Sequence, residues 1–251
     1  MDCSFAKLSF VIIEYYSIDE ILVCFRSIVE NMLKDITYEV VISSNSVYSI
    51  DEQVRLKKKY NTLKWVFNEK NGGFAYAMNQ GLKVATGDIL VIMNPDVKIK
   101  IGMENMIRYL LQHGEVGIIA PQIRNSAGVI QDSFRDFIIP FRFVKRHLDR
   151  LCKKKLCNVP ESCTVIDWVI GAFMMMSRQA YEAVGGLDDG YFLYCEDMDL
   201  CKRMHLKGYS VVYYPEAIIE YEGTRSARHS WKYARIFLRS LFRYWRKFGV
   251  Y

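Results

Sequence analysis

The sequence lacks an apolar run long enough to span a bilayer, and it has few prolines and no closely paired cysteines. Its 251 residues include 5 prolines and no Pro- or Ser-rich linker, which favours one continuous domain. The first ten residues lack a secretory signal pattern. The 7 cysteines are odd in number and form no Cys-x-x-Cys pair, which argues against a zinc site or a disulfide framework. We therefore expect a cytoplasmic protein with reduced thiols.

Acidic residues are missing from the C-terminal end, residues 225–251, although the net charge of the whole chain is only +6. Aromatic and aliphatic residues alternate there with the bases, as an amphipathic basic helix requires. Such helices bind the interface of anionic membranes, which predicts a peripheral contact at the inner face of the plasma membrane. Two other interpretations remain. The apolar side could pack on the domain, and nucleic acid would suit the charge, although no nucleic-acid motif is present, so no nucleic-acid partner is expected.

Strands and helices are expected to alternate along most of the chain, which favours an α/β fold with a mostly parallel sheet. Two capping-box signatures, Ser17 with Glu20 and Ser49 with Glu52, predict helix starts. The predicted strands are 8–13, 38–43, 63–67, 89–93, 116–120 (ended by Pro121), 165–177 (through Gly171) and 210–214. The predicted helices are 17–32, 49–60, 74–85 (closed by Gly87), 102–113, one from 179 and one from about 196. Residues 125–128 predict a hairpin turn, and 136–160 a mobile loop or short helix over the site.

Asp96 follows the most apolar predicted strand, Ile89 to Met93, from which it is separated by Asn94 and Pro95. Ligands of open α/β sheets bind beyond the carboxyl ends of the strands, so Asp96 is placed to hold a divalent cation against a diphosphate. A turn aspartate after proline is the simpler alternative. Likewise, Gly72-Gly73 before a helix matches no phosphate-loop motif and predicts a tight turn.

Asp197 is the second candidate, in the first turn of the helix predicted near Glu196. Helical spacing puts Asp197 on one face with Leu200, Cys201 and Met204, where it is the odd carboxylate. It is either a partly desolvated general base or an acid that favourably meets the helix dipole. The opposite face contains Glu196, Asp199, Arg203 and Lys207, and is expected to be solvated, with an Asp199–Arg203 ion pair.

Several motifs together resemble glycosyltransferase family 2, most closely its bacterial rhamnosyltransferase-like branch, from about Leu8 to Ser226. They are Asn94-Pro-Asp96, Asn71-x-Gly73-Phe74 with Asn79-x-Gly81, Gly171-Ala-Phe-Met, and Gly186-Leu-Asp-x-x-Tyr-Phe-Leu-Tyr-x-Glu-Asp-x-Asp-Leu-Cys-x-Arg203. The resemblance implies a GT-A fold, with a Rossmann-like sheet covered by helices on both faces. The domain would span 1–224, with a nucleotide-sugar half to about 97 and an acceptor half after it, followed by a helical tail, 225–251.

The resemblance also implies an inverting transfer of a sugar from a nucleoside diphosphate, dependent on Mn²⁺ or Mg²⁺. Thymidine diphosphate rhamnose is the favoured donor, and a cell-envelope glycan or its lipid-linked precursor the favoured acceptor. The implied catalytic residues are Asp197 as base and its neighbour Glu196, with Asp96 and Glu220 as metal ligands. The implied donor-binding residues are Glu14, Tyr15, Tyr16, Ser44, Asn45, Asn71, Gly73, Phe74, Asn79 and Asn94. The implied acceptor-side residues are Trp168, Gly171, Ala172 and Tyr194.

Three positions depart from the family pattern. Ser44 stands where aspartate often binds the nucleotide base, Asn94 replaces a frequent aspartate, and Glu220 stands where histidine is usual. Glu220 offers a hard cation an oxygen ligand, or else marks a lost metal site. These departures motivate a rival hypothesis, a catalytically silent scaffold with a GT-A-like fold that binds a partner enzyme or a membrane. A nucleotidyltransferase is disfavoured because its Gly-rich basic loop is missing.

Overall fold

The computed structural model describes residues 6–32, 35–140, 159–223 and 230–249. Most of the segment predicted as a mobile loop or short helix, 141–158, lies outside the described residues. Among the helices within these ranges, none combines the length and apolar character needed to cross a membrane.

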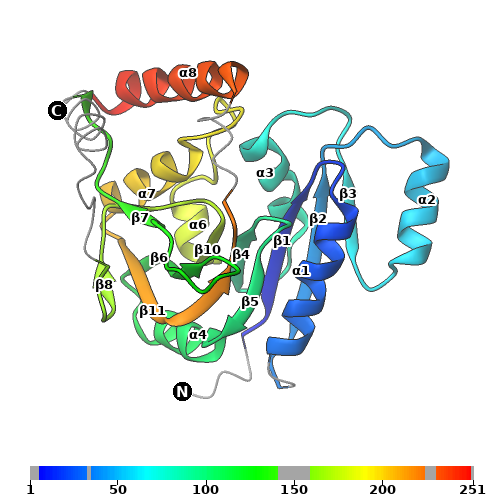
Figure 1. Cartoon of the computed structure of the whole chain (residues 1–251), viewed down its shortest axis with the longest axis horizontal. Coiled ribbons are helices and arrows are strands. Elements are labelled where there is room, and N and C mark those ends of the chain that lie inside the picture. Colours follow the sequence, from blue (N-terminus) through cyan, green and yellow to red (C-terminus); the bar gives the residue numbers. More distant parts are fainter. Residues whose placement is uncertain (1–5, 33–34, 141–158, 224–229, 250–251) are drawn as a thin grey trace.

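A mixed sheet forms the centre of the molecule (Figure 1), in the order β3-β2-β1-β4-β10-β6-β11-β5 with β8 paired to β11. The parallel half comprises β1 (Leu8–Glu14), β2 (Tyr38–Ser44), β3 (Lys64–Phe67) and β4 (Ile89–Met93). In the other half, β6 (Val116–Arg124) and β11 (Ser210–Glu220) are parallel, whereas β5 (Lys98–Ile101), β8 (Thr164–Val165) and β10 (Phe173–Ser177) run antiparallel to their neighbours. Two short strands, β7 (Phe134–Arg135) and β9 (Trp168–Val169), pair separately. The predicted α/β fold class is confirmed, with a central sheet that is parallel in one half and mixed in the other.

Helices cover both faces of this sheet, and each face has its own apolar core. One core contains side chains of α1 (Ile18–Asn31) and α4 (Met103–Gln112), while α2 (Ile50–Lys59) flanks β3. The other contains side chains of α3 (Phe74–Val84), α6 (Arg178–Ala183), α7 (Glu196–Leu206) and α8 (Trp231–Phe248). All five residues of β4 are buried, as its unbroken apolar run predicts.

Three predicted boundaries of strands and helices differ from the structure. Strand β6 continues through Pro121, at the point where the register of β11 shifts and the ladder is irregular. The single strand predicted over 165–177 is divided into β8, β9 and β10, because the chain leaves the main sheet after β8, pairs with β7 through β9 and returns to the main sheet at β10. Helix α3 ends with Ala85 as its C-cap, and Gly87 instead packs against the backbone of Leu8.

The capping box at Ser17 does not form, whereas the one at Ser49 does. The Ser17 backbone N–H donates to the Glu14 carboxylate at 3.0 Å, so a side chain from β1 replaces the expected local cap. The hairpin turn at 125–128 is confirmed by the Gly128 N–H bond to the Asn125 carbonyl, 2.9 Å, and by an antiparallel bridge between Arg124 and Ile130.

The face of α7 that was expected to be solvated is mostly buried. Asp199 is fully buried and Glu196 is 5% exposed, although the predicted Asp199–Arg203 ion pair does form, at 2.5 Å. The burying element is α8, which lies across α7 at one end of the molecule (Figure 1) and bonds Asp199 through Lys247. Helical periodicity shows which residues share a face, but it does not show which faces a distant element will cover.

Candidate active site

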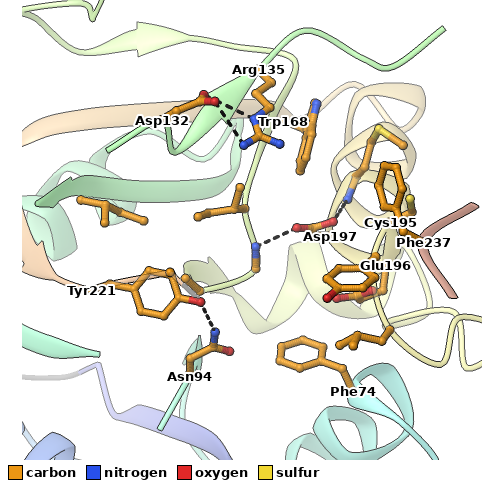
Figure 2. Close-up of a pocket in the computed structure, with 18 of the residues that line it drawn as sticks. Phe74, Asn94, Asp132, Arg135, Trp168, Cys195, Glu196, Asp197, Tyr221 and Phe237 are labelled. Atoms are coloured by element: carbon orange, nitrogen blue, oxygen red, sulfur yellow. Dashed lines mark hydrogen bonds and ion pairs between the residues drawn. The ribbon is translucent and has the colours of Figure 1, made fainter. Parts of the chain in front are cut away.

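A cavity of about 410 Å³ opens beside the N-terminus of α7 (Figure 2). Both catalytic candidates, Asp197 and Glu196, line it. The four acceptor-side candidates line it too, as do Phe74 and Asn94 from the donor set. Lining residues that the sequence did not single out include Gln131, Asp132, Arg135, Tyr221, Glu222 and Tyr233. The cavity therefore joins residues that are more than a hundred positions apart in the sequence.

Asp197 is fixed in this cavity by backbone donors. Its carboxylate accepts the Gly171 N–H at 2.9 Å and the Met198 N–H at 2.8 Å. Burial raises the pKa of Asp197, although these two N–H groups and the charge of Arg135 act in the opposite direction. A general base works best when its pKa lies near the working pH, so a raised carboxylate pKa suits proton abstraction.

Glu196, beside it, is almost completely buried, and its Oε2 atom has no hydrogen-bond partner among the described residues. Burial and the neighbouring Asp197 carboxylate raise the pKa of Glu196 well above its usual range. A protonated Glu196 beside an ionised Asp197 would put a hydrogen-bond donor and an acceptor on one cavity wall.

Two left-handed residues precede this pair, Tyr194 at φ 70° and Cys195 at φ 66°. Such backbone is strained for residues other than glycine, and it persists only where surrounding contacts fix it. One fixing contact is the Phe192 carbonyl, which accepts the Phe74 N–H at 2.8 Å. A Cβ on Gly73 would lie 2.1 Å from this oxygen, so glycine is required there. The close approach joins the start of α3 to the segment that carries the base.

Arg135 is the one cationic side chain among the described residues that line the cavity. Its guanidinium pairs with Asp132 at 3.2 Å and lies over the Trp168 ring at 5.5 Å (Figure 2). A motif-based analysis misses it because the two-stranded ladder of β7 and β9, rather than a sequence motif, brings it beside Trp168.

Asn94 and Tyr221 lie on the other side of the cavity, where Asn94 Nδ2 donates to the Tyr221 hydroxyl at 3.2 Å (Figure 2). Burial raises the pKa of Tyr221 to about 12, and the charges of Asp96 and Asp197 add to the effect. Tyr221 is therefore within electrostatic reach of both the predicted metal ligand and the predicted base.

Asp96 lies just beyond β4, as the sequence predicts, and is half-buried. Burial raises its pKa, and so does the charge of Glu20 on α1. No basic side chain in the described ranges pairs with Asp96, so a bound cation would supply its missing countercharge.

The described residues contain no group of three His, Cys, Asp or Glu side chains arranged to hold a metal. Mg²⁺ sites often use one or two carboxylates and complete the shell with substrate phosphates and water. Asp96 fits a cation held in that way.

Glu220 does not fit the same site. Its carboxylate pairs with Lys98 at 2.7 Å and Lys100 at 2.9 Å, and these two lysines lower its pKa. Neither Glu220 nor Asp96 is among the cavity-lining residues, but the two lysines already neutralise Glu220, whereas no basic side chain in the described ranges pairs with Asp96. The geometry gives no support to Glu220 as a metal ligand.

The donor-side candidates at the ends of β1 and β2 form a hydrogen-bonded network. Glu14 is fully buried, and its carboxylate accepts the hydroxyls of Ser44 at 2.5 Å, Ser46 at 3.1 Å and Tyr48 at 3.1 Å. Ser44 is equally buried, so Glu14 and Ser44 support the loops that follow β1 and β2 and are not exposed on the surface. Tyr15 and Tyr16 are exposed at this end, and their rings lie 4.9 Å apart.

Asn45 and Asn71 lead from these loops toward α3. Asn45 Nδ2 donates to the Gly73 carbonyl at 3.0 Å and to Asn71 Oδ1 at 3.2 Å. Asn79 is placed differently from what was predicted. Its Nδ2 atom donates to the Leu187 carbonyl at 2.8 Å, and its Oδ1 atom accepts the Leu187 N–H at 3.1 Å and the Tyr181 hydroxyl at 2.9 Å. It holds the loop before α7 and does not line the cavity.

Two family models match this chain. The model described as glycosyl transferase family 2 matches residues 9–185, well over half of the sequence. A second, described as the N-terminal domain of galactosyltransferase, matches residues 164–230 and thus covers the segment that contains Asp197.

Curated relatives agree with the first family. The chain is 27% identical over 230 residues to the rhamnosyltransferase WbbL of Escherichia coli, covering 87% of this chain and 86% of that protein. It is 28% identical over 140 residues to the N-acetylglucosaminyl-diphospho-decaprenol L-rhamnosyltransferase of Mycobacterium tuberculosis, covering 52% of this chain but only 45% of that longer protein.

Solved structures share the fold at low sequence identity. A structure of GalNAc-T7 with UDP, GalNAc and Mn²⁺ aligns with a TM-score of 0.66 at 13% identity, covering 86% of this chain and 43% of that one. The mannosyltransferase PcManGT of Pyrobaculum calidifontis, in complex with GDP-Man and Mn²⁺, gives 0.58 at 18%, covering 91% and 60%. These GT-A neighbours, the family match and the rhamnosyltransferase relatives together show that this chain is a glycosyltransferase and belongs to family 2.

Proposed function

We propose that the enzyme transfers a sugar, with inversion, from a nucleoside diphosphate to a hydroxyl of a lipid-linked glycan, with Asp197 as the general base. The observation that carries this proposal is the placement of Asp197. Its carboxylate is held at 2.9 Å by the Gly171 N–H, inside a cavity whose lining includes Asn94, two residues before Asp96 in the chain. The proposed base and the end of β4, where the diphosphate is proposed to bind, thus border the same cavity, as direct displacement requires.

The proposed reaction is a single displacement. The acceptor oxygen forms a bond to the anomeric carbon and gives its proton to Asp197. The bond from that carbon to the donor diphosphate breaks, and the diphosphate leaves with the electron pair. Asp96 would hold a Mn²⁺ or Mg²⁺ ion, which supplies charge neutralisation on the leaving group.

Thymidine diphosphate rhamnose is the proposed donor, because two curated relatives are rhamnosyltransferases. The name of the mycobacterial relative also suggests a diphosphate-linked prenol sugar as acceptor. Sugar transfer from thymidine diphosphate rhamnose to a synthetic N-acetylglucosaminyl diphosphate lipid therefore tests the proposal directly.

We expect calorimetry to show binding of thymidine diphosphate rhamnose that strengthens when Mn²⁺ is present, and weaker binding of uridine diphosphate glucose. The physical reason is that a cation shared by Asp96 and the diphosphate joins two groups that otherwise repel each other. If a folded protein binds neither donor with or without Mn²⁺, the proposed donor class is wrong.

The outer face of α8 is proposed to contact the membrane. Trp231 is 83% exposed, Leu238 50% and Phe242 69%, and all three lie on one face by helical spacing. The exposed bases Lys232, Arg235, Arg239 and Arg246 accompany them, and α8 contains no acid. Apolar side chains beside unopposed positive charge suit the interface of an anionic bilayer.

We expect the double change Trp231→Ser and Phe242→Ser to weaken binding to phosphatidylglycerol vesicles by about tenfold, because exposed apolar area that would be buried in the interface is lost. A vesicle co-sedimentation assay at two salt concentrations measures this. Ile101→Ser, at a 58% exposed apolar residue on β5, is the matched control. Equal binding by the double variant and the control would contradict the membrane role of α8.

A further inference from the structure

Asp199 is a fully buried acid that the proposed mechanism does not use. Its carboxylate is bonded by the Arg203 Nε atom at 2.5 Å, the Lys247 Nζ atom at 2.6 Å and the Tyr191 hydroxyl at 3.3 Å. Arg203 belongs to the same helix, but Lys247 comes from the last turn of α8. A buried carboxylate two residues after the proposed base therefore depends on the C-terminal helix for one of its two cations.

Helix α8 also holds the segment that leads to the base. Lys247 bonds Asp188 at 2.8 Å, and Arg243 bonds the same carboxylate at 2.8 Å. Although burial opposes it, these cations lower the pKa of Asp188 to about 2. The Ser240 hydroxyl donates to the Leu193 carbonyl at 2.8 Å. The segment from Asp188 to Asp199 is thus attached to α8 at both ends and near its middle.

The same helix forms part of the cavity wall. Phe237 of α8 lines the cavity (Figure 2), and its ring lies 5.9 Å from the ring of Tyr194, one of the two left-handed residues. Tyr194 and Tyr233 line the cavity too. Strained backbone keeps its conformation only under such contacts. The terminal helix, which the sequence suggested to be a separate tail, is therefore placed to act on the site itself.

We propose that Lys247 is a positioning residue for sugar transfer, acting through Asp199 to hold the first turn of α7 and to balance the charge beside Glu196 and Asp197. This inference rests on the proposed role of Asp197 as base. Lys247 does not line the cavity, so its effect on transfer is indirect.

The titratable groups that face the pair come from several elements. Asp199 lies on α7 itself, the Cys195 thiol, whose pKa burial raises, precedes it, and the cation Arg135 approaches from β7. Tyr194 and Tyr221 also line the cavity. Asp199 acts electrostatically on Glu196 and raises its pKa. Removal of the Lys247 charge leaves more uncompensated negative charge at Asp199, which favours the protonated forms of Glu196 and Asp197.

The test is the pH dependence of kcat for Lys247→Met, assayed with thymidine diphosphate rhamnose and the synthetic acceptor. We expect the acid limb to move to higher pH by about 0.5–1 unit, because the base then holds its proton more tightly. Lys247→Arg should restore the wild-type limb. The double variant Lys247→Met, Asp199→Asn removes one charge of each sign and should also return the midpoint toward wild type.

Lys207→Met, the same change at the exposed C-cap of α7, is the matched control and should leave the midpoint unchanged. A second readout, the ¹³C titration of the Glu196 and Asp197 carboxyls assigned with Glu196→Gln and Asp197→Asn, needs no turnover. A carboxyl midpoint that does not move in Lys247→Met overturns the inference. If the carboxyl midpoints move but Asp197→Asn keeps full turnover, the proposed base is wrong and the action of Lys247 on the pair stands.

Discussion

Asp197→Asn is expected to lower kcat by about 10²–10⁴-fold, the usual contribution of a positioned general base. Asparagine has nearly the shape of aspartate, but its single amide oxygen can accept only one of the two N–H bonds, because Gly171 and Met198 donate to different carboxylate oxygens. It cannot take up the acceptor proton at neutral pH. Donor binding should be unchanged, and steady-state turnover together with donor calorimetry measures the two effects separately.

The wild-type pH profile provides a check on the same residue. Burial raises the pKa of Asp197, so its ionised, active form is lost as the pH falls through that raised value. We expect the acid limb of kcat to lie above the range of an exposed aspartate. Turnover in Asp197→Asn equal to wild type would remove Asp197 as the base, whatever the shape of this profile.

Asp96→Asn is expected to abolish the strengthening of donor binding by Mn²⁺ and to lower kcat by at least about 10²-fold. A cation stabilises a leaving diphosphate by several kcal/mol, and each 1.4 kcal/mol is tenfold in rate. The half-buried Asp96 carboxylate has no basic partner among the described residues, and a bound cation would offset the burial and the Glu20 charge that raise its pKa. Calorimetry with and without Mn²⁺, followed by turnover at saturating donor, measures both losses.

Glu220→Gln is the matched control for this prediction. The sequence assigns Glu220 to the metal, but the structure pairs it with Lys98 and Lys100, at 2.7 and 2.9 Å. We expect Glu220→Gln to keep Mn²⁺-dependent donor binding. If Glu220→Gln loses the Mn²⁺ dependence of donor binding and Asp96→Asn retains it, the cation is not held by Asp96. The metal ligand is then Glu220, as the sequence resemblance implies.

Local patterns were sufficient for much of this molecule. The apolar run Ile89–Met93 forms a buried strand, as predicted. The predicted alternation of strands and helices forms a sheet that is covered by helices on both faces. The helix start at Glu196 was predicted within a residue. Such features depend on the periodicity of apolar residues and on turn-forming residues, and both are properties of residues that are close together in the sequence.

The candidate site was predicted in part, for a related reason. Motif spacing brought out Asp197, Glu196 and the acceptor-side residues, and the structure places them all around one cavity. The motif analysis missed Arg135, because no motif contains it. The same analysis assigned Asn79 to the donor, whereas in the structure the Asn79 amide is bonded to the loop before α7. A motif identifies which residues occur together, whereas only packing decides which polar atoms remain free for a ligand.

The role of the C-terminal helix was decided by tertiary structure. Its basic, aromatic pattern predicts an amphipathic helix, and α8 is one, but the pattern is equally compatible with a membrane face and with a packed face. In the fold one face of the helix is exposed, with Trp231 and Phe242, and another is packed on the domain, with Leu241 and Tyr244 buried. The sequence by itself determined most of the helices and strands, the family and the candidate for the base. The burial of Asp199 under Lys247 and the closure of the cavity by Phe237 depend on contacts between residues far apart in the chain, which local periodicity does not contain.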